Sequence, residues 1–271
     1  MDILTVRASM LPSYADCPRR AVAKQWRRLV ENRGFVLRRM QPSAGAAVGT
    51  AVHAAAAKML KEKIETGSTG SAKDGLDAAM EVFREEIKEG AVWDATTPNA
   101  QTAETQIGRL SATYHEHVAG ELDPIAVEQE WECLLGDGFL LSGHCDVLTR
   151  EGFIRDLKTG ALSRPHHAQL GAYALLARSQ RPAIEIRGVV VDFIRRTPKT
   201  KPQDAPVSEE YDLNVAENTA FETIQRIKHD LTAFLDNSNP WAFMANPLSM
   251  MCRSAYCPAH GTTFCHLGRE N

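Results

Sequence analysis

Three polar residues in the middle of the chain could together hydrolyse a phosphodiester bond. Asp156 and Lys158 are two positions apart, and Asp146 precedes them by about ten residues. If residues 139–149 and 152–158 form paired strands, both carboxylates and the ammonium group face the same side. Two such carboxylates repel each other unless a cation lies between them, and their hard oxygen atoms suit Mg²⁺ or Mn²⁺. The metal would activate water, and the lysine would stabilise charge growing on the phosphate.

A solvent-exposed hairpin is the alternative interpretation of these three residues. In that case Asp146 and Asp156 are hydrated, and Lys158 pairs with one of them. An isolated Asp-x-Lys is far more often a charged surface than a site. The choice therefore depends on the elements around it and on further motifs.

Strand patterns surround the three residues. Two strands are predicted at 125–135 and 139–149, joined by a Gly-Asp-Gly turn. A third strand is predicted at 152–158. A continuous β-branched apolar run predicts a buried strand at 184–195. Helical spacing of apolar residues, with Ser and Gly near the boundaries, predicts helices over 13–32, 45–65, 72–90, 100–119, 164–178 and 214–236.

The order of these elements favours a single α/β domain over residues 1–271. Helices come first, then three strands, a helix, a strand, a helix and a Pro- and Cys-rich tail from Asn237. This order predicts a mixed central β-sheet flanked by helices. We divide the domain into a mainly helical part (1–120), a catalytic sheet with its helix (121–200), and a helix with the cysteine-rich tail (201–271).

Composition and charge are those of an ordinary globular protein with local basic surfaces. The 271 residues are 44% apolar and 24% charged, with a net charge of −3. Residues 1–40 nevertheless hold nine Lys or Arg against three acidic residues, and such a patch can bind phosphates. We include Arg19 and Arg20 among the predicted DNA contacts. A second basic cluster comprises Arg195, Arg196, Lys199 and Lys201.

Four short motifs occur in order along the chain. They are Gly49-x-x-x-His53, Gly143-x-x-Asp146, Asp156-x-Lys158-Thr-Gly and Gln169-x-x-x-Tyr173. Each is weak alone, because residues four apart merely share a helix face. Together they resemble the PD-(D/E)XK signature of RecB-like nucleases.

The resemblance implies a restriction-endonuclease-like core and a metal-dependent deoxyribonuclease, with exonuclease action. It assigns catalysis to Asp146, Asp156 and Lys158, and Mg²⁺ or Mn²⁺ to His53, Asp146, Asp156 and the Leu157 carbonyl group. It also implies that Gln169 and Tyr173 support the site and contact DNA. Relatives carry an acidic residue before the hairpin, and the sequence leaves open whether Glu128 or Glu130 fills that place. Three nearby histidines match no family position and are bystanders or DNA contacts: His144, His166 and His167.

The cysteines extend the resemblance to the chain ends. Cys17 and three tail cysteines, Cys252, Cys257 and Cys265, resemble the ligands of a [4Fe–4S] cluster in the AddB nuclease domain and in CRISPR-associated exonucleases. The tail lacks the usual opening Cys-x-x-Cys of those relatives. Structural Zn²⁺ remains an alternative because His260 and His266 lie among the tail cysteines. Two further cysteines, Cys133 and Cys145, fall in predicted strands and are expected to be packing residues.

Three functions are compatible with these features. The first is a DNA nuclease acting on single strands or duplex ends in recombination, repair or phage DNA processing. The second is a non-catalytic DNA-binding subunit that keeps the fold, and the third is a cytosolic metal or redox protein. The intact Asp146, Asp156 and Lys158 favour the first. The absence of a phosphate-binding loop means that a helicase would be a partner, as would a recombinase or integrase. We expect no membrane contact, a cytoplasmic location (the host cytoplasm if phage-encoded), and leave a homo-oligomer open.

Overall fold

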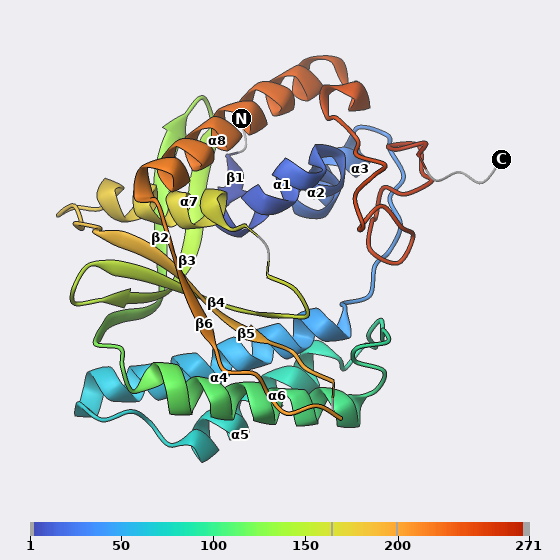
Figure 1. The fold of residues 1–271 in the computed structure, drawn as a ribbon. Helices are drawn as coiled ribbons and strands as arrows, with labels where there is room; N and C mark the ends of the chain where they lie inside the picture. Colours follow the sequence, from blue (N-terminus) through green and yellow to red (C-terminus); the bar gives the residue numbers. More distant parts are fainter. Residues whose placement is uncertain (1–2, 164, 199, 268–271) are drawn as a thin grey trace.

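A computed structural model describes residues 3–163, 165–198 and 200–267, and one six-stranded sheet runs through it (Figure 1). The strands are β1 (Leu4–Arg7), β2 (Pro124–Gly136), β3 (Phe139–Thr149), β4 (Phe153–Gly160), β5 (Gly188–Arg195) and β6 (Val207–Tyr211). The α-helices are α1 (Leu11–Asp16), α2 (Pro18–Gln25), α3 (Arg27–Asn32), α4 (Ala44–Thr66), α5 (Ala72–Glu86), α6 (Ala100–Tyr114), α7 (His167–Ser179) and α8 (Leu213–Asn237). Short helical turns are η1 (Ala8–Met10), η2 (His115–Ala119) and η3 (Pro240–Ala242). The mixed α/β fold predicted from the sequence is confirmed.

The sheet forks between β3 and β4. Strand β3 pairs with β2 in antiparallel fashion along its length and with β1 in parallel fashion at its start. Its pairing with β4 is limited to Val147 opposite Arg155 and Leu148 opposite Ile154. Beyond this point β4 leaves β3 and continues the sheet with β5, in parallel, and then β6. The two strands that carry the predicted catalytic residues therefore diverge just where those residues lie.

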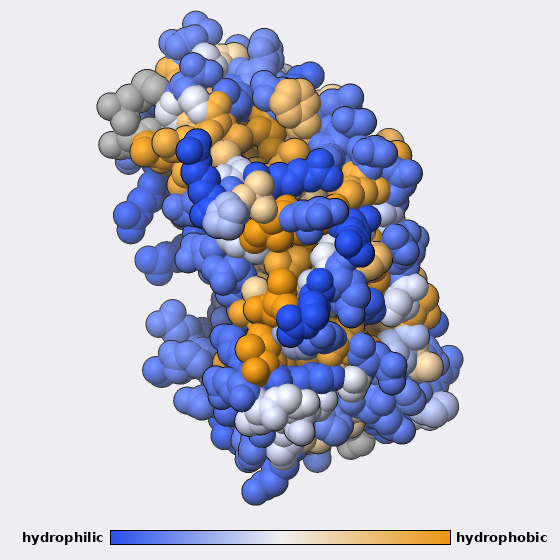
Figure 2. Space-filling model, turned by 90° about the vertical axis from the view of Figure 1, so that its left-hand side faces the viewer, coloured by the Kyte–Doolittle hydropathy of each residue, from blue (hydrophilic) through white to orange (hydrophobic). Residues whose placement is uncertain are grey.

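Two hydrophobic cores cover the two faces of this sheet. One contains residues of α1, α2, α7 and α8, and the other contains residues of α4, α5 and α6. Figure 1 shows these helices as an upper and a lower layer with the sheet between them. Viewed from the left-hand side of Figure 1, the molecule is hollowed at mid-height, and apolar side chains run down the middle of a mostly hydrophilic face (Figure 2). The helices thus form two layers, one on each face of the sheet.

The N-terminal region differs from the predicted single helix over 13–32. The structure divides it into α1, α2 and α3, with Cys17 between the first two in an extended conformation (φ −155°, ψ 98°). The physical reason is Pro18, which disfavours helical backbone at the residue before it. Cys17 therefore lies at a break between two helices instead of within one. Strands β1 and β6 were not predicted, and β5 begins at Gly188 instead of residue 184.

The C-terminal tail packs on α8 through aromatic rings. Phe243 and Phe264 are fully buried and lie with their ring centroids 5.2 and 5.9 Å from that of Phe234. Trp241, two residues before Phe243, is 75% exposed, and the Arg19 guanidinium group lies over its ring. Of the helices in the described ranges, none combines the length and the apolar character that a membrane crossing requires.

Candidate active site

Asp146 and Asp156 lie where the sheet forks. The β3–β4 register would set them opposite each other at its next step, but the pairing ends there. Instead, the Leu157 N–H donates a 2.8 Å hydrogen bond to Asp146 Oδ2. The hairpin argument placed the two carboxylates on one face of paired strands. The strands do pair as a hairpin as far as Val147 and Arg155, but they separate where the carboxylates lie.

Lys158 and α7 surround the Asp156 carboxylate. Lys158 Nζ lies 2.6 Å from Asp156 Oδ2, and Gln169 Nε2 donates to Asp156 Oδ1 at 3.2 Å. Gln169 Nε2 also lies 2.8 Å from the Tyr173 hydroxyl oxygen. Gly143 permits this close packing of α7, because a Cβ there would lie 2.8 Å from Tyr173 Cε1. Tyr173 of the Gln-x-x-x-Tyr motif therefore packs against Gly143 of the Gly-x-x-Asp motif.

His53 reaches the site from α4 in the opposite layer. Its Nδ1 atom lies 3.3 Å from Asp146 Oδ2. Gly49, one turn earlier, faces the end of β4, and a Cβ there would be 3.4 Å from Thr159 Oγ1. This face of α4 therefore lies against β4, which brings the imidazole to the carboxylate.

Glu128 completes the group, and a local change in β2 puts it there. Glu128 has a positive φ of 52°, which is uncommon for a residue other than glycine. On one side of it Trp131 packs in the α7–α8 core, whereas Val127, which regular alternation would place with Trp131, packs against the α4–α6 core. The strand therefore exchanges its faces at Glu128. Glu130 remains exposed, beside His144.

Three of these residues have the spacing of a cation site. Single ligand atoms of His53, Glu128 and Asp146 all lie within 4.8 Å of one another, and each side chain is partly buried. A nitrogen and two carboxylate oxygen atoms suit Mg²⁺ or Mn²⁺. The donor set therefore fits the divalent metal that the sequence implied. Asp156 is engaged by Lys158 and Gln169 beside this group.

The charges in the site are strongly coupled. Burial raises the pKa of Asp156 to about 6, against the opposing effect of Lys158. Burial also raises the pKa of Glu128, and the Asp146 charge adds to this rise. Burial alone would lower the pKa of Lys158. The neighbouring Asp156 and Asp146 carboxylates raise this pKa by more than burial lowers it, so the ammonium group stays charged. A divalent cation bound among these carboxylates would favour their ionised forms and so oppose the rise in their pKa values.

A cavity of about 740 Å³ opens onto these residues. Its walls include His53, Asp146, Lys158, Gln169 and Tyr173. The N-terminal segment closes another side with Arg7, Gln25 and Trp26, and His144 and Glu130 also line it. A substrate phosphate in this cavity could therefore meet Lys158 and Asp146, whereas the Asp156 carboxylate is fully buried. His144 faces the cavity, although no motif had assigned it a role.

An ion pair behind the site was not identified from the sequence. Arg155 lies 2.5 Å from the buried Asp192 carboxylate, and Ser208 Oγ donates to the same oxygen at 2.6 Å. Asp192 is the β5 partner of Leu157, whose N–H binds Asp146. The pair thus fixes β4 against β5 next to the metal group. Asp192 lies in a β-branched run that gave no signal of a polar contact.

The four cysteines of the predicted cluster line one small cavity. Cys17, Cys252, Cys257 and Cys265 surround about 10 Å³ of space, together with His260. The Asn246 N–H donates to Cys17 Sγ at 3.5 Å. Burial raises the pKa of the Cys257 thiol. Cys145 is fully buried, as expected for packing, and Cys133 is half-buried; neither lines this cavity.

Arg19 and Arg20, predicted DNA contacts, are 4% and 5% exposed. Arg19 Nε donates to the Phe243 carbonyl group, and Arg20 Nη2 lies 2.7 Å from Asp16 Oδ2. Both therefore fasten the tail to the first helices, and their contact with DNA stays a prediction. In the second basic cluster, Lys199 lies outside the described residues.

Comparisons with known proteins place the chain in a nuclease superfamily. Residues 6–262 match the model of the PD-(D/E)XK nuclease superfamily, and the chain belongs to that superfamily, which implies a metal-dependent nuclease. A crystal structure of a candidate exonuclease from Eubacterium rectale has 11% identity and a TM-score of 0.55, covering 92% of this chain and 87% of its own. The structure of SSO0001 has 14% identity, covers 83% of this chain and 77% of its own, and its TM-score of 0.34 supports no argument. No curated protein matches the sequence.

Proposed function

We propose that the protein is a divalent-metal-dependent deoxyribonuclease that removes nucleotides from DNA ends. The observation that carries the proposal is the grouping of His53, Glu128 and Asp146 within 4.8 Å, beside Asp156 and Lys158. His53, Asp146 and Lys158 line the same open cavity, and Asp156 is fully buried next to Lys158. Superfamily membership supports a nuclease. The candidate exonuclease with the same fold supports the exonuclease mode.

His53, Glu128 and Asp146 would hold Mg²⁺ or Mn²⁺, with Asp156 and the Leu157 carbonyl group as further ligands. When bound, the metal supplies Lewis-acid polarisation of a phosphoryl oxygen and a lowered pKa for water. The Leu157 N–H orients Asp146 by its 2.8 Å hydrogen bond. A carboxylate held in this way keeps its oxygen atoms aimed without reorganisation.

Lys158 would orient the attacking water and donate to the charge that develops on the phosphate. Its ammonium group is held by Asp156 at 2.6 Å and faces the cavity. Gln169 positions Asp156, and Tyr173 lies 2.8 Å from the same amide nitrogen. Both line the cavity and would contact the DNA strand. We place the enzyme in recombination, repair or phage DNA processing, with a helicase, recombinase or integrase as partner.

We further propose that the four cysteines hold a [4Fe–4S] cluster. They line one buried cavity, although they come from opposite ends of the chain. Both chain ends therefore supply thiols to one cavity, as a four-thiolate cluster requires. Structural Zn²⁺ bound by these cysteines with His260 is the alternative.

The proposed activity can be tested with anaerobically purified protein and end-labelled single- and double-stranded DNA, with RNA in parallel. We expect cleavage with Mg²⁺ or Mn²⁺, none with EDTA, and none by the Asp146→Ala variant. Mononucleotide products would identify an exonuclease. If the wild-type protein binds DNA but cuts it with neither metal, it is a binding subunit.

Glu128 and Glu130 offer a matched pair for the metal site. We expect Glu128→Gln to weaken Mn²⁺ binding by about ten- to a hundredfold, because it removes one anionic ligand. Glu130→Gln, two residues further along β2 and exposed, should leave Mn²⁺ affinity unchanged within about twofold. Isothermal titration calorimetry measures both. Equal losses in the two variants would remove Glu128 from the ligand set.

Metal affinity should fall in mild acid. The Asp156 pKa of about 6 lies above its ordinary range because of burial, so the carboxyl group is protonated below that pH and ionised above it. Because the cation binds the ionised form, the Mn²⁺ association constant should drop by about tenfold from pH 7 to pH 5 through this group alone. Calorimetric titrations across this range would reveal the drop. An affinity that is constant over the range contradicts the ligand role of Asp156.

A further inference from the structure

A second groove continues from the catalytic cavity toward the cysteine-rich tail. It encloses about 490 Å³ between α1, the loop that precedes α7, and residues 249–251 of the tail. Ser9 and Gln169 line both the groove and the catalytic cavity. Because Gln169 also binds Asp156, the groove opens directly beside the catalytic carboxylate. A strand that occupies the catalytic cavity could continue into this groove.

The groove walls suit nucleobases better than a row of phosphates. Five apolar side chains line it: Pro12, Leu162, Pro165, Met250 and Met251. Among the described residues of its wall, the cation Arg20 is already paired with the anion Asp16. A duplex presents mainly its phosphates to such a surface. An unpaired strand exposes its base faces, and these can pack against the apolar side chains of the wall without regard to sequence.

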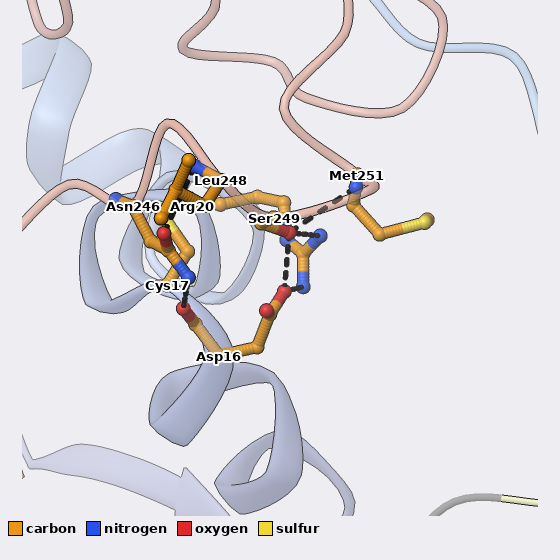
Figure 3. Close-up of polar contacts among 7 residues, drawn as sticks. All are labelled: Asp16, Cys17, Arg20, Asn246, Leu248, Ser249 and Met251. Atoms are coloured by element: carbon orange, nitrogen blue, oxygen red, sulfur yellow. Dashed lines mark hydrogen bonds and ion pairs between the residues drawn. The ribbon is translucent and has the colours of Figure 1, made fainter.

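Asp16 holds the methionine wall in place. Ser249 Oγ donates to Asp16 Oδ2 at 2.7 Å, and Arg20 Nη2 lies 2.7 Å from the same oxygen (Figure 3). The Met251 N–H in turn donates to Ser249 Oγ at 3.1 Å. At the other end of the segment, Asn246 Nδ2 donates to the Asp16 carbonyl group at 2.9 Å. The segment from 246 to 251 is thus fastened twice to one residue of α1.

The same contacts border the cysteine cavity. Arg20 and Ser249 line both that cavity and the groove. The neighbour of Asp16, Cys17, accepts a hydrogen bond from Asn246, and Cys252 follows the methionine wall directly. The segment between the groove and the cysteines therefore cannot move without disturbing both.

We propose that this groove binds single-stranded DNA adjoining the scissile bond, and that Asp16 couples its methionine wall to the metal held by the cysteines. Asp16 is a positioning residue, because it holds Ser249 and Arg20 in place. The proposed catalytic residues lie elsewhere, on β3 and β4. The inference rests on the proposed nuclease function and specifies its substrate as an unpaired strand.

The test measures strand binding without cleavage. Fluorescently labelled oligothymidylates, as a dinucleotide, a hexamer and a dodecamer, are titrated by anisotropy into the Lys158→Ala protein. Affinity should rise with length as the groove fills. Adding Asp16→Ala or Ser249→Ala should weaken dodecamer binding by about tenfold, because a charge-assisted contact that orders the wall is lost. The dinucleotide should be affected less, so the gain in affinity with length shrinks.

Three comparisons keep the result specific. Ser249→Thr retains the hydroxyl group and should restore dodecamer binding. Asp123→Ala removes an Asp–Arg ion pair (with Arg150, 2.8 Å) at the exposed turn beside β2 and should have no effect. A blunt duplex should show no dependence on Asp16. If duplex and single strand lose affinity equally, or if the gain with length survives Asp16→Ala, the groove does not bind a single strand.

Coupling to the cysteine metal is tested by a double-mutant cycle. Cys265→Ser, which removes a cavity cysteine and leaves the hydrogen bonds of Asp16 in place, should release the metal and weaken dodecamer binding. Adding Asp16→Ala should then cause little further loss, and metal content by elemental analysis supplies an independent readout. Fully additive losses would overturn the coupling. If the wild-type protein cleaves nucleic acid but the losses in dodecamer binding are additive, only this inference is refuted. If the wild-type protein cleaves no nucleic acid, the nuclease proposal itself is refuted.

Discussion

Replacing Lys158 with alanine should lower kcat for DNA cleavage by about 10³-fold while the divalent metal still binds. The ammonium group lies 2.6 Å from Asp156, is 22% exposed, and faces the catalytic cavity. Removing a donor that stabilises charge in the transition state typically costs this much. The variant loses no metal ligand, so its Mn²⁺ affinity at about pH 8 should be equal to or higher than that of the wild type. Single-turnover cleavage and calorimetry measure the two quantities.

A distant lysine provides the control for this prediction. Lys88 is 69% exposed and pairs with Glu85 after α5, so Lys88→Ala should leave kcat unchanged. A loss of Mn²⁺ binding in Lys158→Ala would mean that the lysine maintains the shape of the site. A kcat within about tenfold of the wild-type value would remove Lys158 from the chemistry.

Replacing Cys257 with serine should release the metal of the cysteine cavity and destabilise the tail. Cys257 is 5% exposed and shares the cavity with Cys17, which is more than two hundred positions earlier in the sequence. A metal bound only by the folded chain contributes its binding free energy to folding. We expect the visible absorption of thiolate-bound iron to disappear and Tm to fall by about 10 °C.

Cys133→Ser is the matched control, because Cys133 is half-buried on β2 and lies outside the cavity. It should retain the full iron content and a Tm within about 2 °C of the wild-type value. Iron bound at full stoichiometry in Cys257→Ser would exclude Cys257 as a ligand. Stoichiometric zinc in the wild-type protein, with no iron, would mean that the cysteines bind zinc and not an iron–sulfur cluster.

The sequence predicted the elements that carry the catalytic residues. Strand β3 has the predicted bounds, and β2, β4, α4, α7 and α8 begin and end within a few residues of those expected. The apolar runs, the helical spacing of apolar residues and the turn glycines are local features, so they could be interpreted without the fold. The spacing of Asp146, Asp156 and Lys158 on adjoining strands likewise predicted a shared face, because side chains on a strand alternate.

The choice between Glu128 and Glu130 required the tertiary structure. Both lie on the same strand two residues apart, and by alternation alone they would face the same side. The positive φ of Glu128 makes β2 exchange its faces at that residue. Such a backbone conformation is maintained by packing of both cores, which the local sequence does not encode.

The roles of the N-terminal basic residues also depended on the tertiary structure. The sequence showed Arg19 and Arg20 in a positively charged segment, where exposure to phosphates is the ordinary expectation. The structure buries both against the tail, where Arg20 meets Asp16 and Ser249. Residues from opposite ends of the chain form these contacts, and the sequence carries no local signal of them. The sequence therefore determined which residue types could do the chemistry, and the packing of distant segments decided which of them meet.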